Sequence, residues 1–233
     1  ITWWLLEGLL MLKLSREQIA WRAAQDIPDG AVVNLGIGMP VAVSNHLPAD
    51  RDVFFQSENG VVGVGPAAAE GHGDPDLVDA GSRQITLRAG GTIIDSAASF
   101  AMIRGGHIDI CVLGAYQVAE NGDLANWATL DTSKPPGVGG AMDLAVGAKQ
   151  IFVMMDHCTK TGEPKLMQNC TYPLTGFGVV RTVFTDLAVI DVTEGGFVAR
   201  EITAGISFEE LQEKTAAPLT LAENWQTLTP PEL

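Results

Sequence analysis

Short apolar runs of β-forming residues, separated by turns and helix-like segments, limit the fold of this chain more than any other feature. The runs occupy residues 31–35, 53–57, 108–113 and 151–155. After the first run, Gly36 and Gly38 supply a turn, and Pro40 suits the first turn of a helix that extends to about Leu47. Further helices are expected at 96–104 and from Gly139-Gly140 to about Gly147. Because strands that are apolar on both faces and joined by helices form parallel sheets, the sequence predicts an α/β fold with helices flanking a mostly parallel sheet.

The C-terminal third has a different pattern. Three closely spaced strands are expected at 179–184, 187–192 and 197–202, with turns at Asp186 and Gly195-Gly196. This spacing predicts an antiparallel edge of the same sheet. Capping-box spacings at Ser15/Gln18 and Ser207/Glu210 mark the starts of an early helix and of a terminal one.

Neither a linker nor an internal repeat interrupts the chain, so we expect a single domain over residues 11–222. The Pro/Thr-containing segment 223–233 is expected to be a loose tail. Residues 1–10 are apolar but too short to span a bilayer, and they are interrupted by Glu7. Since Met11 looks like a more natural start, we interpret residues 1–10 as an extension or a misassigned start, with an apolar arm that contacts a partner as the alternative.

Charge and cysteine content exclude several classes of protein. The 233 residues carry 14 Lys and Arg against 28 Asp and Glu, for a formal net charge of −14 at pH 7. Such a surface repels nucleic acid and anionic membranes, so we expect neither as a partner. Cys111, Cys158 and Cys170 form an odd set without a C-x-x-C spacing, which argues against a disulfide framework and a zinc site. We therefore expect a reducing, cytoplasmic setting and no metal.

Common catalytic motifs are missing from the sequence. No Gly-Lys dipeptide, G-x-S-x-G elbow or H-E-x-x-H helix is present. Gly36-x-Gly38 follows a strand, yet the third glycine of a dinucleotide turn is missing, which favours a plain tight turn. His157 and Cys158 are adjacent on an extended segment, so their side chains point to opposite faces, and a structural or solvent-facing role is favoured for His157.

Glu58 is the most informative acidic residue. It stands at the end of an apolar strand, immediately before Asn59-Gly60, which permit a sharp turn. Side chains at the carboxyl ends of the strands of a parallel sheet lie where α/β proteins bind ligands. A glutamate with an ordinary pKa of about 4.3 is ionised at neutral pH and can act as a nucleophile without a neighbouring base. The alternative is a solvated turn residue without a function.

Small residues at 137–140 precede the helix expected from Gly139-Gly140. Such residues leave backbone N–H groups exposed where a developing oxyanion could be stabilised. Glycines serve turn geometry and helix packing as well, so the segment alone does not decide between these roles.

Four ordered segments, at residues 57–60, 99–109, 122–127 and 137–143, together resemble the B (β) subunit of family I coenzyme A transferases. The likeness covers roughly residues 14–219 and implies the open α/β sandwich of that family. It implies that Glu58 is the nucleophile, that Gly140, beside Gly139, contributes to the oxyanion site, and that Asn34 contacts coenzyme A (CoA). Asn59 and Gly60 are expected at the same binding site. Relatives often have Ala-Gly-Lys where this chain has Ala-Gly-Ser-Arg83, so a lysine contact to CoA is in doubt.

The resemblance also implies a reaction. Such a subunit moves CoA from succinyl-CoA to a 3-oxoacid through a glutamyl-CoA thioester, needs an A (α) subunit in an expected α₂β₂ heteromer, and uses no cofactor beyond CoA as substrate. Segments 154–166 and 170–176 are more similar to the 3-oxoadipate branch than to the acetate/acetoacetate or ketone-body branches. An acyl-CoA hydrolase using the same Glu58 and a non-catalytic metabolite-sensing module are the alternatives.

The second carboxylate of 3-oxoadipate calls for an additional cation near the acyl group. Lys160, Lys165, Arg181 and a residue of the A subunit are the candidates at this point.

Overall fold

The computed structural model of the chain describes residues 13–131, 133, 135–137 and 139–233. The extension expected at residues 1–10 lies outside the described residues. Within the described part, none of the helices has the length and apolar character needed to cross a membrane.

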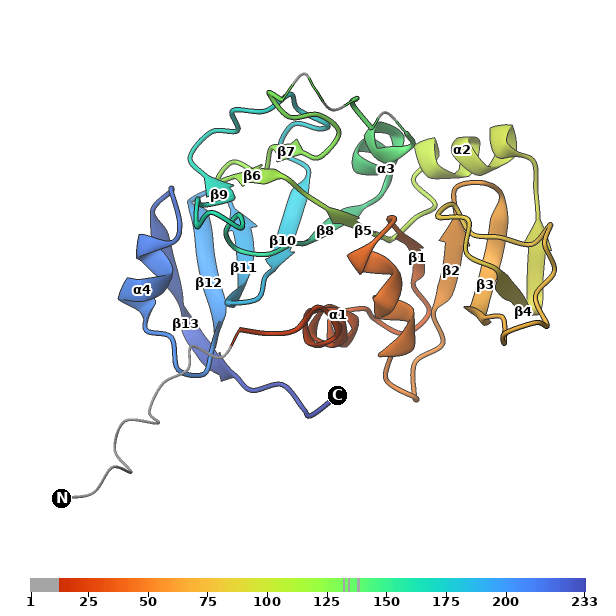
Figure 1. The fold of residues 1–233 in the computed structure, drawn as a ribbon, viewed down its shortest axis with the longest axis horizontal. Helices are drawn as coiled ribbons and strands as arrows, with labels where there is room; N and C mark the ends of the chain where they lie inside the picture. The colour runs from red at the N-terminus through yellow and green to blue at the C-terminus, as the bar shows by residue number, and fades with distance from the viewer. Residues whose placement is uncertain (1–12, 132, 134, 138) are drawn as a thin grey trace.

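Helices and strands alternate in the first two thirds of the chain, and strands dominate the rest (Figure 1). The helices are α1 (Arg16–Gln25), the 3₁₀ helix η2 (Met39–Asn45), α2 (Ser96–Arg104), α3 (Ala141–Gly147) and α4 (Phe208–Glu213). The strands of the large sheet are β1 (Val32–Leu35), β2 (Phe54–Ser57), β3 (Val61–Ala67), β4 (Ile85–Ile93), β5 (Ile110–Gly114), β8 (Gln150–Met154), β10 (Val180–Phe184), β11 (Ala188–Thr193), β12 (Gly196–Thr203) and β13 (Leu219–Leu228). A smaller sheet contains β6 (Gln117–Ala119), β7 (Leu124–Ala125) and β9 (Leu166–Met167).

The large sheet has the order β13-β12-β11-β10-β8-β5-β1-β2-β3-β4. Its central strands β10, β8, β5, β1 and β2 are parallel, which confirms the predicted mostly parallel sheet. The antiparallel C-terminal strands are confirmed by the β10–β11 and β11–β12 pairs. Two features were not predicted: β3 and β4 make the opposite edge antiparallel as well, and the outermost strand β13 runs parallel to β12.

Helices cover both faces of the central strands. In Figure 1, α1 lies on one side of the sheet and α2 and α3 lie on the other. Residues along β5 alternate between the two layers, since Ile110 and Val112 pack with α1 while Cys111 and Leu113 pack with α2 and α3. This alternation explains why the sequence of the central strands is apolar without interruption.

Local sequence signals account for most helix boundaries. Ser15 and Ser207 form the predicted capping boxes. The cap of α2 is Asp95, whose side chain accepts a hydrogen bond from the Ala98 N–H, directly before the helix expected at 96–104. The predicted helix after Pro40 is a 3₁₀ helix, because it begins at a glycine without a side-chain cap and contains two β-branched valines in seven residues.

The loose tail expected at residues 223–233 is wrong for its first half. The strand β13 extends to Leu228, and Gln226–Leu228 pair with Glu201–Thr203 of β12. The polar stretch that suggested a tail is a bulge: Leu221 pairs with Ala199, whereas the next pair along the strand joins Gln226 to Glu201. The domain boundary expected at 222 therefore falls inside a strand.

The two leucines of β13 offer a matched test of this correction. Leu228 is 5% exposed in the core on the α1 side, whereas Leu221 is 38% exposed. We expect Leu228→Ala to lower the free energy of unfolding by about 2–4 kcal/mol, because it leaves a cavity, and Leu221→Ala to lower it by less than about 1 kcal/mol. Denaturant unfolding followed by circular dichroism measures both. If both substitutions lowered the free energy of unfolding by the same small amount, residues 223–228 would be a loose tail and not part of a strand.

Candidate active site

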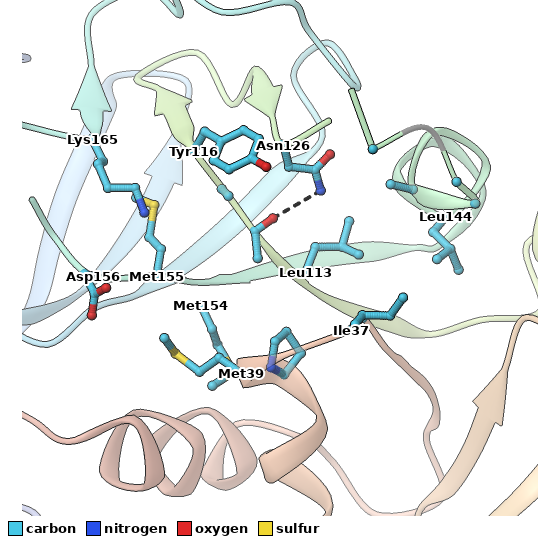
Figure 2. Close-up of a pocket in the computed structure, with 18 of the residues that line it drawn as sticks. Ile37, Met39, Leu113, Tyr116, Asn126, Leu144, Met154, Met155, Asp156 and Lys165 are labelled. Atoms are coloured by element: carbon cyan, nitrogen blue, oxygen red, sulfur yellow. Dashed lines mark hydrogen bonds between the residues drawn. The ribbon is translucent and has the colours of Figure 1, made fainter. Parts of the chain in front are cut away.

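A cavity of about 420 Å³ opens at the carboxyl ends of the parallel strands (Figure 2). Residues that directly follow these strands line it: Gly36 and Ile37 after β1, Glu58 after β2, Ala115 and Tyr116 after β5, and Met155 and Asp156 after β8. The strand β1 pairs with β2 on one side and with β5 on the other, so the chain order reverses here. Such a reversal is where α/β sheets bind ligands, and it places this cavity by topology alone.

Glu58 is the first residue of the three-residue turn between β2 and β3. Gly60 closes this turn with φ +117°, and a side chain there would clash with the carbonyl oxygen of Ile94. The Gly60 N–H donates to the Ser57 carbonyl oxygen, and Asn59 fixes the outer side of the turn by donating to the Val78 carbonyl oxygen. The turn therefore needs glycine at position 60 and holds Glu58 at the mouth of the strand.

A buried polar network lies beneath this turn. The side-chain amide of Gln56 donates to the Ser99 hydroxyl at 2.8 Å and to the Ser57 carbonyl oxygen at 3.1 Å. Asn34 in turn donates to the side-chain oxygen of Gln56 at 2.6 Å, and the Cys111 thiol donates to Asn34. Because buried amides need partners, this network fixes the end of β2 against β1, β5 and α2.

The backbone at Gly140 approaches the Glu58 carboxylate more closely than any side chain would allow. A Cβ atom at Gly140 would lie 2.9 Å from the carboxyl carbon and from both carboxylate oxygens of Glu58. The backbone of Gly140 therefore lies directly against this carboxylate. Gly140 caps α3 with a φ of −69°, so it is required for space and not for its backbone conformation.

Burial is the main influence on the ionisation of Glu58. Removal from water raises the pKa of the carboxyl above its ordinary value, and the negative charge of Asp143 raises it further. The Gly140 N–H acts in the opposite direction because it stabilises the charged form. Glu58 is thus a half-buried carboxylate facing a cavity, which does not fit the alternative of a fully solvated turn residue.

Two cations and one further acid also line the cavity. Figure 2 shows Lys165 and Asp156 at one end and Leu144 and Ile37 at the other. Arg16 is exposed at the start of α1. Asn126, drawn between these ends, donates to the Gly114 carbonyl oxygen at 3.1 Å and so supports the floor of the cavity.

His157 has a structural role, as predicted. Its ring is fully buried between the hydroxyls of Thr185 and Thr215, at 3.0 and 2.9 Å. Burial lowers its pKa to about 3, so the ring is neutral. Among the described residues, no three His, Cys, Asp or Glu side chains are grouped as metal ligands would be.

The structure brings together three of the six predicted site residues. Glu58, Gly139 and Gly140 line the cavity. Asn34, Asn59 and Gly60 do not: Asn34 is 2% exposed within the buried network, and the other two shape the turn. For these three, the expected contact with CoA finds no support in this geometry.

Arg83 lies elsewhere, on a smaller hollow next to the cavity. Its guanidinium pairs with Asp79 at 3.1 Å. Ile37 lines both the hollow and the cavity, so Arg83 is near the site without facing Glu58.

Three charged or aromatic residues that line the cavity were missed by sequence reasoning. Tyr116 lies two residues after the end of β5, and Asp156 lies two residues after the end of β8. This shared position at the carboxyl ends of central strands was the signal that could have identified them. Arg16 carried no such signal, because only the packing of α1 brings its helix end to the cavity.

Comparison with known families and proteins agrees with this geometry. A family model described as coenzyme A transferase matches residues 16–214. The chain is 56% identical over 207 residues to the B subunit of the 3-oxoadipate CoA-transferase of Acinetobacter baylyi, covering 89% of this chain and 95% of the relative. It is 48% identical over 213 residues to the B subunit of the probable succinyl-CoA:3-ketoacid coenzyme A transferase of Bacillus subtilis, covering 91% and 98%.

A solved structure shows the same fold. The acyl-CoA transferase apoenzyme from Escherichia coli O157:H7 superposes with a TM-score of 0.74 at 20% sequence identity. The match covers 93% of this chain but 43% of that one, so this chain spans less than half the length of that enzyme.

The raised pKa of Glu58 predicts a pH-dependent cost in stability. In the unfolded chain this carboxyl has an ordinary pKa near 4.5, and in the folded chain its pKa is higher. Ionisation therefore favours the unfolded state, and the stability of the fold decreases as the pH rises from the unfolded pKa through the folded one. We expect Glu58→Gln to raise the free energy of unfolding at pH 7, a gain that disappears at pH 4.

Denaturant unfolding at both pH values measures this gain. Glu223→Gln, at an exposed position of β13, reports the effect of merely removing one negative charge from an acidic chain. A gain at position 58 no larger than the gain at position 223 would contradict the desolvation of Glu58.

Proposed function

The chain belongs to the coenzyme A transferase family, and we propose that it is the catalytic B subunit of an enzyme that moves CoA from succinyl-CoA to a 3-oxoacid, with 3-oxoadipate preferred. The observation that carries the proposal is the close approach of the Gly140 backbone to the Glu58 carboxylate at the cavity, which leaves no room for a side chain at position 140. The relatives named for 3-oxoadipate and 3-ketoacid substrates, at 56% and 48% identity, support the substrate class.

The half-buried carboxylate suits covalent catalysis. An oxygen of Glu58 attacks the thioester carbon of succinyl-CoA, the C–S bond breaks, and an acyl-glutamyl anhydride and CoA thiolate result. The thiolate then attacks the glutamyl carbon and expels succinate, leaving a glutamyl-CoA thioester. An acceptor carboxylate repeats these steps in reverse and leaves as its CoA ester. No cofactor beyond CoA takes part.

Stabilising the first of these steps is the proposed role of Gly140. In this step a carboxylate displaces a thiolate, which is the better nucleophile, so the step is uphill. It therefore needs a hydrogen-bond donor at the carbonyl oxygen, where negative charge develops. The Gly140 backbone lies against the attacking carboxylate, so its N–H is the proposed donor to the carbonyl that the carboxylate attacks. Gly139 lines the cavity one residue earlier. Partial desolvation of Glu58 also leaves less water to remove before the attack.

A partner completes the proposed site. Both of these bacterial relatives are named as B subunits, which supports pairing of this chain with an A subunit. The assembly that we propose is α₂β₂, with the A subunit covering the cavity that contains Glu58. The proposal includes a cytoplasmic setting, supported by three free thiols.

Trapping the covalent intermediate tests the proposed nucleophile. The complex of this chain with its A subunit is mixed with succinyl-CoA and no acceptor, then digested and analysed by mass spectrometry. We expect CoA on the peptide that contains Glu58. Glu58→Gln should abolish the adduct and lower turnover by about 10⁴-fold or more, because the amide keeps the shape and loses the nucleophile. Hydrolysis of succinyl-CoA without an adduct would indicate a hydrolase, and neither product would indicate a sensor.

Gly140→Ala tests the close approach separately. The new methyl group must displace the carboxylate, which is the flexible end of its side chain, so the fold survives while the geometry is lost. We expect turnover to fall by about 10²–10³-fold with an unchanged thermal midpoint. Gly195→Ala, at a remote turn where the methyl group meets only an ordinary contact with Thr193, is the matched control. Activity of Gly140→Ala within about twofold of the native enzyme would exclude the proposed contact.

A further inference from the structure

Lys165 differs from the other cations considered for the second carboxylate of the acceptor. Lys160 is exposed on a turn, and Arg181 is exposed near the amino end of β10, away from the strand ends that form the site. Neither lines the cavity that contains Glu58, whereas Lys165 does. Among the described residues, only Arg16 and Lys165 bring a positive side chain to this cavity.

The backbone holds Lys165 in a fixed place. Its N–H donates to the His157 carbonyl oxygen at 3.1 Å, and its carbonyl oxygen accepts from the Val118 N–H at 3.0 Å. The residue is therefore clamped between the segment that follows β8 and the small strand β6, just before β9. Arg16, by contrast, is the exposed first residue of α1.

The ammonium group of Lys165 has no direct partner within the described residues, since its side chain forms neither a hydrogen bond nor an ion pair there. Burial lowers the pKa of Lys165, and the charges of Asp156 and Asp186 oppose that lowering. Asp186 is also engaged elsewhere, since it pairs with Lys13 at 3.3 Å and accepts the His157 N–H at 2.6 Å. Asp156 is exposed at the same end of the cavity. A partly desolvated cation without a direct ion pair is suited to bind a carboxylate.

Lys165 and Glu58 line the same cavity of about 420 Å³ from different elements. Three inter-strand spacings of about 4.8 Å, or about 14 Å, separate the end of β2, where Glu58 lies, from the end of β8, where Asp156 lies at the same end of the cavity as Lys165 (Figure 2). An extended six-carbon chain with bonds of about 1.5 Å is about 6 Å long, so it fits within this span. In Figure 2, Lys165 and Leu144 of α3 lie at opposite ends of the cavity, and Gly140 caps α3.

We propose that Lys165 binds the distal carboxylate of a dicarboxylic acyl group whose thioester carbon lies at Glu58, and so sets the preference for a 3-oxo diacid over a 3-oxo monoacid. This inference rests on the proposed function of Glu58. It adds a specificity residue that acts on the substrate and leaves the chemistry at Glu58 unchanged.

The test isolates one half-reaction so that the carboxylate of succinate plays no part. The complex with the A subunit is mixed in single turnovers with 3-oxoadipyl-CoA or with acetoacetyl-CoA, and formation of the Glu58–CoA thioester is timed. We expect Lys165→Met to lower the ratio of the two rates by about 10–100-fold, because it removes one charge-assisted contact and keeps the length of the side chain. Lys165→Arg should retain most of the ratio. Lys160→Met makes the same change on the exposed turn and should leave the ratio as in the native complex.

The outcomes separate this inference from the proposed function. Native complex that forms the thioester with neither substrate would overturn both. Thioester formation with an unchanged ratio in Lys165→Met would overturn the role of Lys165 alone, as would a fall in the ratio that appears in Arg16→Gln instead. If Lys165→Met fails to assemble with the A subunit, Lys165→Gln is compared with Lys165→Arg by the same ratio.

Discussion

One close approach, of the Gly140 backbone to the carboxylate of Glu58, joins the two sides of the site. Glu58 belongs to a turn at the end of β2, and Gly140 caps α3 about eighty residues later. Their meeting requires β2 to pair with β1 and α3 to pack against β5, the neighbour of β1 on its other side. The buried amides of Asn34 and Gln56 hold the first of these elements, and the packing of Leu144 and Ala145 holds the second. Parallel strands thus supply a rigid frame on which a small carboxylate site is built.

Glu58 illustrates the balance that such a site needs. Burial raises its pKa, and with it the basicity of the carboxylate, while one N–H keeps the charged form accessible. More donors would stabilise the carboxylate and weaken it as a nucleophile, whereas none would leave it protonated more readily. The charge of Asp143 is moderated by its pairing with Arg104 at 2.7 Å. In the proposed mechanism, the burial that lowers stability at Glu58 also makes its carboxylate more reactive.

The parallel sheet could be predicted from the sequence because strands that are apolar without interruption are buried on both faces. Sequence reasoning assigned Glu58 and Gly140 to the site through the resemblance, because an acid at the end of a strand and glycines before a helix left both roles open by themselves. It expected Asn34 to contact CoA, since a polar residue in a buried strand can serve a ligand or a neighbouring amide, and in the structure its side chain is bonded to Gln56. The strand β13 was missed because its middle bulges into solvent and reads as polar. Which lysine faces the cavity depended on the pairing of β6 with β9, a contact between segments far apart in the chain.

The fate of the carboxylate oxygens tests the central claim, covalent catalysis by Glu58, most directly. The complex with the A subunit reacts with succinyl-CoA and a 3-oxoacid whose carboxylate carries ¹⁸O. The mass of the peptide that contains Glu58 is then measured by mass spectrometry. If an anhydride joins the acceptor to Glu58, cleavage by CoA leaves the bridging oxygen behind, and the free carboxyl of Glu58 gains ¹⁸O from the acceptor. A Glu58 peptide that stays unlabelled while the product CoA ester forms would contradict covalent catalysis at this residue.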